Sequence, residues 1–119
     1  MPRALVVDDA AFIRLRTRKL LEENGYEVEE AQNGEEAIRK YSETSPDLVL
    51  LDITMPVMDG ITALKGIKQI DPKAKVIMCT AVGQQSLVIE AIKAGANDYL
   101  LKPLDPEKVL AAIKKLAGK

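Results

Sequence analysis

The sequence predicts an α/β fold in which helices cover both faces of a parallel sheet. Short β-rich runs alternate strictly with stretches of helical apolar spacing, and this alternation occurs five times. Two of the runs, at 4–7 and 47–51, are apolar enough to be buried strands. Gly and Pro residues separate many of the elements. Strict alternation requires crossover connections, which place helices on the faces of a parallel sheet.

The first half of the chain is predicted to run strand, helix, strand, helix, strand. These elements are residues 4–7, 11–25, 26–31, 33–44 and 47–51. Gly25 is the natural stop of the first helix, because glycine commonly follows a helix C-terminus. The strand YEVEEA alternates polar and apolar residues, so we expect it nearer an edge of the sheet. Pro46 ends the second helical region.

The second half is predicted to run helix, strand, helix, strand, helix. These elements are residues 59–70, 74–81, 83–96, 98–101 and 105–118. Asp59 is suited to the N-cap of the third helix, and Pro72 breaks the chain after it. Gly95 ends the fourth helix. Asp105 is the expected N-cap of the last helix, with Pro106 at its first position.

Five strands and five helices in a chain of this size suit the flavodoxin-like (βα)5 arrangement, a doubly wound five-stranded parallel sheet of order 2-1-3-4-5. We expect a single domain over residues 1–119 with no output domain, since repeats, low-complexity tracts and linkers are absent from the sequence. The net charge of -1 gives no basic field for nucleic acid. No apolar run approaches the roughly 20 residues needed to span a bilayer.

Histidine is absent from the sequence, and Cys79 is the only cysteine. This composition excludes histidine nucleophiles, thiolate metal clusters and an internal disulfide. Cys79 is expected to be a small core residue, and the cysteine usage fits a reducing cytoplasm. Any metal must be held by oxygen ligands, which favours Mg²⁺ or Mn²⁺ over Zn²⁺.

Polar residues follow the carboxyl ends of four predicted strands. Asp8 and Asp9 follow the first strand and Asp52 follows the third. Thr80 ends the fourth strand, and Lys102 follows the fifth. In this fold, ligands bind beyond these ends, at the switch point between strands one and three. We therefore expect the five side chains to converge at one edge of the sheet.

Three carboxylates in close proximity repel one another, and a divalent cation relieves that repulsion. Mg²⁺ takes oxygen ligands and favours phosphate oxygens, while an adjacent Lys and Thr complete a cage for a phosphoryl group. Asp52 stands alone at a strand end and is the best candidate nucleophile. The adjacent pair Asp8 and Asp9 is better placed to hold metal.

Each of these residues also has a structural alternative. Asp8 and Asp9 could cap the first helix, and Asp52 could be an ordinary turn residue. Thr80 could be strand filler, and Lys102 a solvated loop lysine. The phosphoryl-transfer interpretation is favoured because all of them fall at the same end of different strands.

The segments VVDDA, LLDITMPVMDG, CTA and LLKP together resemble the receiver domain of two-component response regulators, over about Leu5 to Leu116. Within that family, VDDAAF, DITMPVMDGITAL and GQQSLVIEAIKAGA look like the stand-alone chemotaxis regulators. The resemblance implies a phosphorylation-activated switch rather than an enzyme. Asp52 would accept a phosphoryl group from a sensor histidine kinase, and the domain would then change its affinity for a downstream protein, with the flagellar motor switch as the leading candidate.

The resemblance also implies a ligand set for the metal. Asp9 and Asp52 would bind Mg²⁺ directly, together with the backbone carbonyl of Thr54, and Asp8 would act through water. Mn²⁺ would be able to substitute. The domain would assist its own phosphorylation and dephosphorylation, and a cytoplasmic monomer is expected.

Further roles follow from the same resemblance. Lys102 would pair with the phosphoryl group, Thr80 would hydrogen-bond to it, and the bond between Lys102 and Pro103 is expected to be cis. Tyr99 occupies the family's aromatic switch position and would turn inward as Thr80 moves toward the phosphate. Val82 and Thr54 occupy the positions that tune hydrolysis; Val82 is apolar where many relatives carry a polar group.

The residues also bear on three other functions. A phosphorelay shuttle in another two-component pathway is the main alternative. A phosphatase of the haloacid dehalogenase type needs a D-x-D pair after the first strand, whereas Asp8 and Asp9 are adjacent. A flavin carrier is disfavoured because these two carboxylates would repel its phosphate. The first helix is basic because it carries Arg14, Arg16, Arg18 and Lys19, and it is either a solvated face or a docking surface for an acidic kinase domain.

Overall fold

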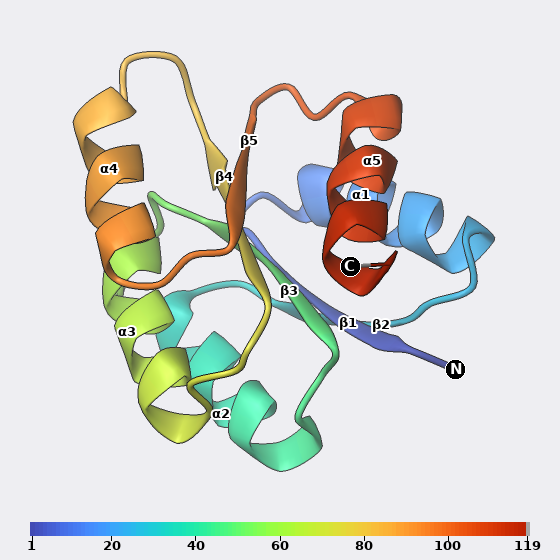
Figure 1. Cartoon of the computed structure of the whole chain (residues 1–119), viewed down its shortest axis with the longest axis horizontal. Helices are drawn as coiled ribbons and strands as arrows, with labels where there is room; N and C mark the ends of the chain where they lie inside the picture. Colours follow the sequence, from blue (N-terminus) through green and yellow to red (C-terminus); the bar gives the residue numbers. More distant parts are fainter. Residues whose placement is uncertain (119) are drawn as a thin grey trace.

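The computed structural model describes residues 1–118 and contains a parallel sheet of order β2-β1-β3-β4-β5, which confirms the predicted topology (Figure 1). The strands are β1 (Arg3–Val7), β2 (Glu27–Ala31), β3 (Leu48–Asp52), β4 (Val76–Thr80) and β5 (Asp98–Leu101). The helices are α1 (Ala11–Glu23), α2 (Gly34–Thr44), α3 (Gly60–Ile70), α4 (Gln85–Lys93) and α5 (Pro106–Gly118). Among the described residues, no helix has both the length and the apolar character needed to cross a membrane.

The sheet forms a middle layer, with α1 and α5 on one face and α2, α3 and α4 on the other (Figure 1). Successive strand residues point to opposite faces, so each strand contributes to two cores. Leu5 and Val7 of β1 pack in the core under α2, α3 and α4. Ala4 and Val6 pack in the other core with residues of α1 and α5. This two-sided burial explains the continuous apolar runs of the inner strands.

The observed boundaries differ from the predicted ones by a few residues. The first helix ends at Glu23, and Gly25 adopts a φ of +90°, a conformation that glycine adopts without strain. β3 extends to include Asp52 as its last residue. The fourth helix is shorter than predicted because Gly83 has a φ of +94° and Gln84 is the N-cap residue.

Two predicted helix caps are confirmed. The Asp59 side chain accepts a hydrogen bond from the Thr62 backbone N–H at 2.9 Å. Asp105 precedes α5, and its side chain accepts from the Glu107 N–H at 3.0 Å. The predicted edge position of the second strand is confirmed as well, because β2 is the first strand of the sheet order.

The start of α3 lies directly against the end of β3. A Cβ atom added at Gly60 would lie 2.0 Å from the Asp52 carbonyl oxygen, and the Gly60 N–H donates to the Ile53 carbonyl at 2.7 Å. Only a glycine fits this approach without moving the backbone. Gly60 therefore fixes where the chain can turn after Asp52.

We expect Gly60→Ala to lower the free energy of unfolding by about 3 kcal/mol or more, because the clash is with backbone rather than a flexible side chain. Gly25→Ala is the matched control: its new Cβ would meet nothing within 4 Å, and only the left-handed backbone is strained, at a cost of about 1–2 kcal/mol. Urea unfolding of both variants measures the difference. Equal losses would contradict the close approach.

Candidate functional site

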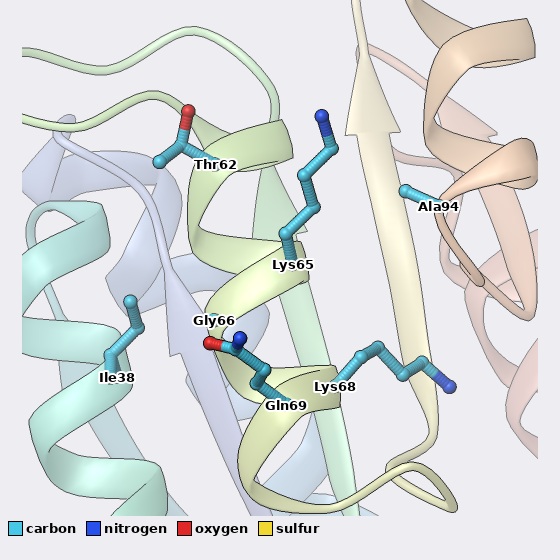
Figure 2. Close-up of a pocket in the computed structure, with 7 residues that line it drawn as sticks. All are labelled: Ile38, Thr62, Lys65, Gly66, Lys68, Gln69 and Ala94. Carbon is cyan, nitrogen blue, oxygen red and sulfur yellow. The ribbon is translucent and has the colours of Figure 1, made fainter.

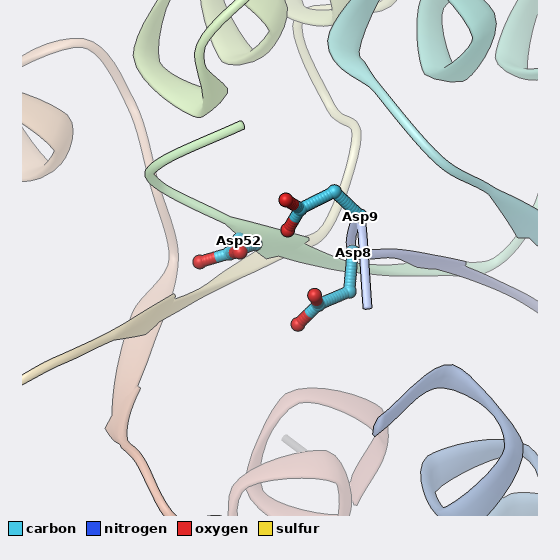
Figure 3. A group of neighbouring side chains, drawn as sticks. All are labelled: Asp8, Asp9 and Asp52. Atoms are coloured by element: carbon cyan, nitrogen blue, oxygen red, sulfur yellow. The ribbon is translucent and has the colours of Figure 1, made fainter. Parts of the chain in front are cut away.

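Three aspartates meet at the carboxyl edge of the sheet, as the sequence predicts. Asp8 directly follows β1, Asp9 is the next residue, and Asp52 ends β3. β1 and β3 are neighbours, with Val7 opposite Leu51, so the residues that follow lie side by side. Each aspartate offers one carboxylate oxygen, and these oxygens lie within 4.8 Å of one another (Figure 3).

The cluster is buried on one side and open on the other. Asp8 is 4% exposed and Asp52 6% exposed, whereas Asp9 faces solvent. The Lys102 Nζ lies 2.9 Å from Asp8 Oδ2 and 3.1 Å from Asp52 Oδ2. One ammonium thus pairs with two of the three carboxylates, so the cluster carries an excess of negative charge when all three are ionised. Such an excess in a buried site favours binding of a cation.

The surroundings raise the pKa values of both Asp52 and Lys102, but for different reasons. Burial raises the pKa of Asp52, and the charge of Asp8 raises it further, against the opposing effect of Lys102. Burial alone would lower the pKa of Lys102, but its hydrogen bond to Asp8 and the charge of Asp52 outweigh burial and raise it. Lys102 therefore stays charged at neutral pH, and ionised Asp52 is held at a cost.

Thr80 and Lys102 reach the site from the ends of β4 and β5. Thr80 is 3% exposed and is the last residue of β4. The Lys102 N–H donates to the Thr80 carbonyl at 2.7 Å, which fixes the backbone of the lysine beside the threonine. The bond between Lys102 and Pro103 is cis. The predicted convergence is therefore present for the side chains of Asp8, Asp9, Asp52 and Lys102, and Thr80 is joined to Lys102 through the backbone.

Helix capping does not account for Asp8 and Asp9. The N-cap of α1 is Ala10, and no side chain caps this helix. Asp8 Oδ1 instead accepts the Ala10 N–H at 2.9 Å, while its Oδ2 faces Lys102. The Arg14 side chain donates to the Asp8 carbonyl at 2.7 Å and also pairs with Glu30. This arginine of the basic helix therefore helps to hold the Asp8 backbone in place.

Three further residues with predicted roles, Tyr99, Val82 and Thr54, are all exposed. Tyr99 on β5 is 50% exposed, and Val82, in the loop after β4, is 80% exposed. Thr54 is exposed in the loop after β3. Its hydroxyl accepts a hydrogen bond from Gln84 Nε2 at 2.7 Å.

Gln84 is a site residue that the sequence did not reveal. Its Oε1 lies 2.9 Å from Thr80 Oγ1 and 2.8 Å from the Ala81 nitrogen. A glutamine before a helix carries no sequence signal for such a role. Its position could be inferred only from the turn at Gly83, which brings the side chain back over the end of β4.

A concavity lies along α3, and none of the three aspartates lines it (Figure 2). It is an open groove of about 640 Å³. Its lining residues are Ile38, Thr62, Lys65, Gly66, Lys68, Gln69 and Ala94. The Lys68 ammonium already donates to the carbonyl of Ala74 and the side chain of Asn97. The groove therefore lacks a convergent set of reactive groups among the described residues, and the aspartate cluster is the better candidate site.

Comparison with known proteins places this geometry in context. The family described as the response regulator receiver domain matches residues 4–114. The chain is 60% identical to the chemotaxis protein CheY of Bacillus subtilis, over 95% of each chain. It is 54% identical to CheY of Thermotoga maritima, over 97% of each. Among solved structures, the CheX-CheY-BeF3-Mg²⁺ complex of Borrelia burgdorferi aligns with a TM-score of 0.93 and 39% identity, covering 99% of this chain and 90% of that one.

We expect Asp52→Asn to stabilise the metal-free protein at neutral pH, because asparagine carries no charge to bury and Lys102 keeps its ion pair with Asp8. The folded-state pKa of Asp52 is raised, so the native state binds this proton more tightly than the unfolded state. Ionisation therefore destabilises the fold at pH values above the usual carboxylate pKa of about 4, and the penalty fades as pH falls through the raised pKa.

Urea unfolding in EDTA at pH 7 and pH 4 checks this expectation. The advantage of Asp52→Asn is expected at pH 7 and is expected to shrink at pH 4. Asp9→Asn serves as the control, because it removes a carboxylate of the same cluster that faces solvent instead of being buried. An Asp52→Asn protein less stable than wild type at pH 7 would contradict the pKa direction.

Proposed function

The chain belongs to the response regulator receiver domain family, and we propose that it is a signalling switch activated by phosphorylation of Asp52. The observation that carries the proposal is the buried Asp52 carboxylate, held 3.1 Å from the Lys102 ammonium and within 4.8 Å of two further carboxylates. Domains of this family are switches rather than conventional enzymes. The similarity to CheY proteins over nearly the whole chain favours a role in chemotaxis.

The donor set suits Mg²⁺. All three carboxylates supply oxygen, the excess negative charge calls for a cation, and the exposed Asp9 leaves one side of the cluster open to water. We propose that Asp9, Asp52 and the backbone carbonyl of Thr54 hold the ion, with Asp8 acting through water and Mn²⁺ able to substitute. When bound, Mg²⁺ neutralises charge on the carboxylates and on phosphoryl oxygens.

Phosphoryl transfer needs little beyond a positioned nucleophile and charge stabilisation. An Asp52 carboxylate oxygen attacks the phosphorus of a phosphohistidine on the sensor kinase. The new O–P bond forms as the P–N bond breaks, and the electron pair of that bond remains on the imidazole nitrogen. The chain has no histidine, so the donor belongs to the partner. Lys102 pairs with a phosphoryl oxygen, and the Thr80 hydroxyl donates a hydrogen bond to another.

The output is proposed to be a change in affinity for a downstream protein. Several large apolar side chains are exposed on α4 and β5, a composition typical of protein-binding surfaces. They are Ile89 (58% exposed), Ile92 (45%), Tyr99 (50%) and Leu101 (54%). Movement of Thr80 toward the phosphoryl group, with inward rotation of Tyr99, would reshape this surface, which also includes residues 84–94 and α5. Phosphorylation must favour the active state by a few kcal/mol to shift the population.

The flagellar motor switch is the proposed downstream partner, in keeping with the chemotaxis relatives. A phosphorelay shuttle remains the second candidate, because it would use the same phosphoacceptor chemistry. The two differ in where the phosphoryl group goes: a shuttle passes it to a histidine on another protein, and a motor regulator loses it to water.

Incubation with acetyl phosphate and Mg²⁺ should add one phosphoryl group to the wild-type protein and none to Asp52→Asn. Intact mass spectrometry is the suitable measurement, since the chain has no tryptophan for a fluorescence assay. EDTA should abolish the gain, and Asp9→Asn should reduce its rate by about tenfold or more. If wild type that binds Mg²⁺ gained no mass, the proposed function would fail.

Val82→Glu should change the rate of dephosphorylation. Val82 is exposed, lies two residues after Thr80 and is apolar, so its side chain offers no hydrogen bond to an attacking water. A carboxylate there can orient or activate that water, and we expect hydrolysis to speed up by about tenfold. Val82→Leu is the control of similar size without polar atoms. Decay of the phosphorylated mass with time gives the rate, and an unchanged rate in Val82→Glu would refute the role of this position.

A further inference from the structure

The Gln84 side chain joins the loops that follow β3 and β4. Its amide nitrogen donates to Thr54 Oγ1 at 2.7 Å, in the loop after β3. Its carbonyl oxygen lies 2.9 Å from Thr80 Oγ1 and 2.8 Å from the Ala81 nitrogen, both at the end of β4. One side chain therefore contacts both loops that carry proposed site residues. We refer to these three contacts as the Gln84 clamp.

The hydrogen-bond donors determine how the clamp is oriented. The Ala81 N–H can only donate, so the amide oxygen of Gln84 must face it and the amide nitrogen must face Thr54. Thr80 Oγ1 approaches that same oxygen, which can only accept. The single hydroxyl proton of Thr80 is therefore directed at Gln84 Oε1, at 2.9 Å. The other acceptor near this hydroxyl, the Ala81 carbonyl oxygen, is farther away at 3.3 Å.

This orientation conflicts with the proposed active state. Thr80 is buried and has one proton to donate. A phosphoryl oxygen on Asp52 can only accept hydrogen bonds, so Thr80 must leave Gln84 before it can donate to that oxygen. Gln84 is also the N-cap residue of α4 and follows Gly83, whose φ of +94° makes the turn. Release of Thr80 is thus linked directly to the start of α4.

We propose that Gln84 is a positioning residue that stabilises the resting state by holding the Thr80 hydroxyl proton away from the phosphoryl site. This inference rests on the proposed function, since it describes the state that phosphorylation must overcome. The clamp sets the resting population of the switch: the more firmly Gln84 holds Thr80, the more free energy the phosphoryl group must supply.

Removal of the clamp should make the loaded state easier to reach. Gln84→Met keeps the length of the side chain but removes both polar atoms. With Mg²⁺ and beryllofluoride as the phosphoryl mimic, we expect Gln84→Met to bind the mimic roughly two- to tenfold more tightly than wild type. The gain corresponds to the one hydrogen bond, from Thr80 to Gln84, that wild type must break when the mimic binds. Amide NMR titration gives the affinity. A residue that merely supports the loop would have the opposite effect, because a disordered loop weakens binding.

Gln85→Met is the matched control, since Gln85 is an exposed glutamine at the first position of α4. It should bind the mimic like wild type. If wild type binds the mimic and Gln84→Met binds it equally or more weakly, this inference is overturned while the proposed function stands. If wild type does not bind the mimic at all, the proposed function falls, and the inference falls with it.

A second measurement examines the clamp without metal or phosphoryl mimic. Thr54→Val removes the hydroxyl that accepts from Gln84. In urea unfolding with EDTA, Thr54→Val and Gln84→Met combined should cost less stability than the sum of the two single losses, because both remove the same hydrogen bond. Strictly additive losses would overturn the clamp in the resting protein.

Discussion

The Lys102 ammonium lies between two buried carboxylates, and the arrangement of the site depends on this contact. It lies 2.9 Å from Asp8 and 3.1 Å from Asp52, and so joins the ends of β1, β3 and β5. Without a positive charge there, two carboxylates of 4% and 6% exposure would repel each other in a poorly solvated position. The pKa of Lys102 is raised, which keeps this charge in place.

The strand order makes this contact possible and also limits it. β5 is separated from β3 by β4, so a long side chain is needed to reach from the end of β5 to the aspartates. The hydrogen bond from the Lys102 N–H to the Thr80 carbonyl holds the lysine backbone against the end of β4. Below the site, the strands are buried on both faces, and that two-sided core supplies stability that can offset the cost of clustered charges. Cys79 belongs to this core: burial raises its thiol pKa to about 12, so it acts in packing.

The sequence predicts the parts of this structure that follow from local pattern. Strand and helix alternation predicts the parallel sheet, and the polar residues after four strands predict the cluster, because parallel strands end at a common edge. Two features escape such prediction. Gly60 is required by a backbone approach to Asp52 that depends on how α3 docks on β3. Gln84 acts across two loops, and its contact with Thr54, thirty residues away, has no signature in either segment. Both depend on tertiary distances rather than on periodicity or motif.

Under the proposed function, the resting site is a set of contacts that an incoming phosphoryl group would have to exchange for new ones. Lys102 forms ion pairs with Asp8 and Asp52, and the Thr80 hydroxyl donates a hydrogen bond to Gln84. A phosphoryl group on Asp52 carries several acceptor oxygens, which can compete for both donors at once. The Lys102 N–H donates to the Thr80 carbonyl oxygen at 2.7 Å, so a movement of one backbone would displace the other. Gln84 is the N-cap residue of α4, so this exchange of hydrogen bonds would connect the charge on Asp52 to the exposed surface of α4 and β5.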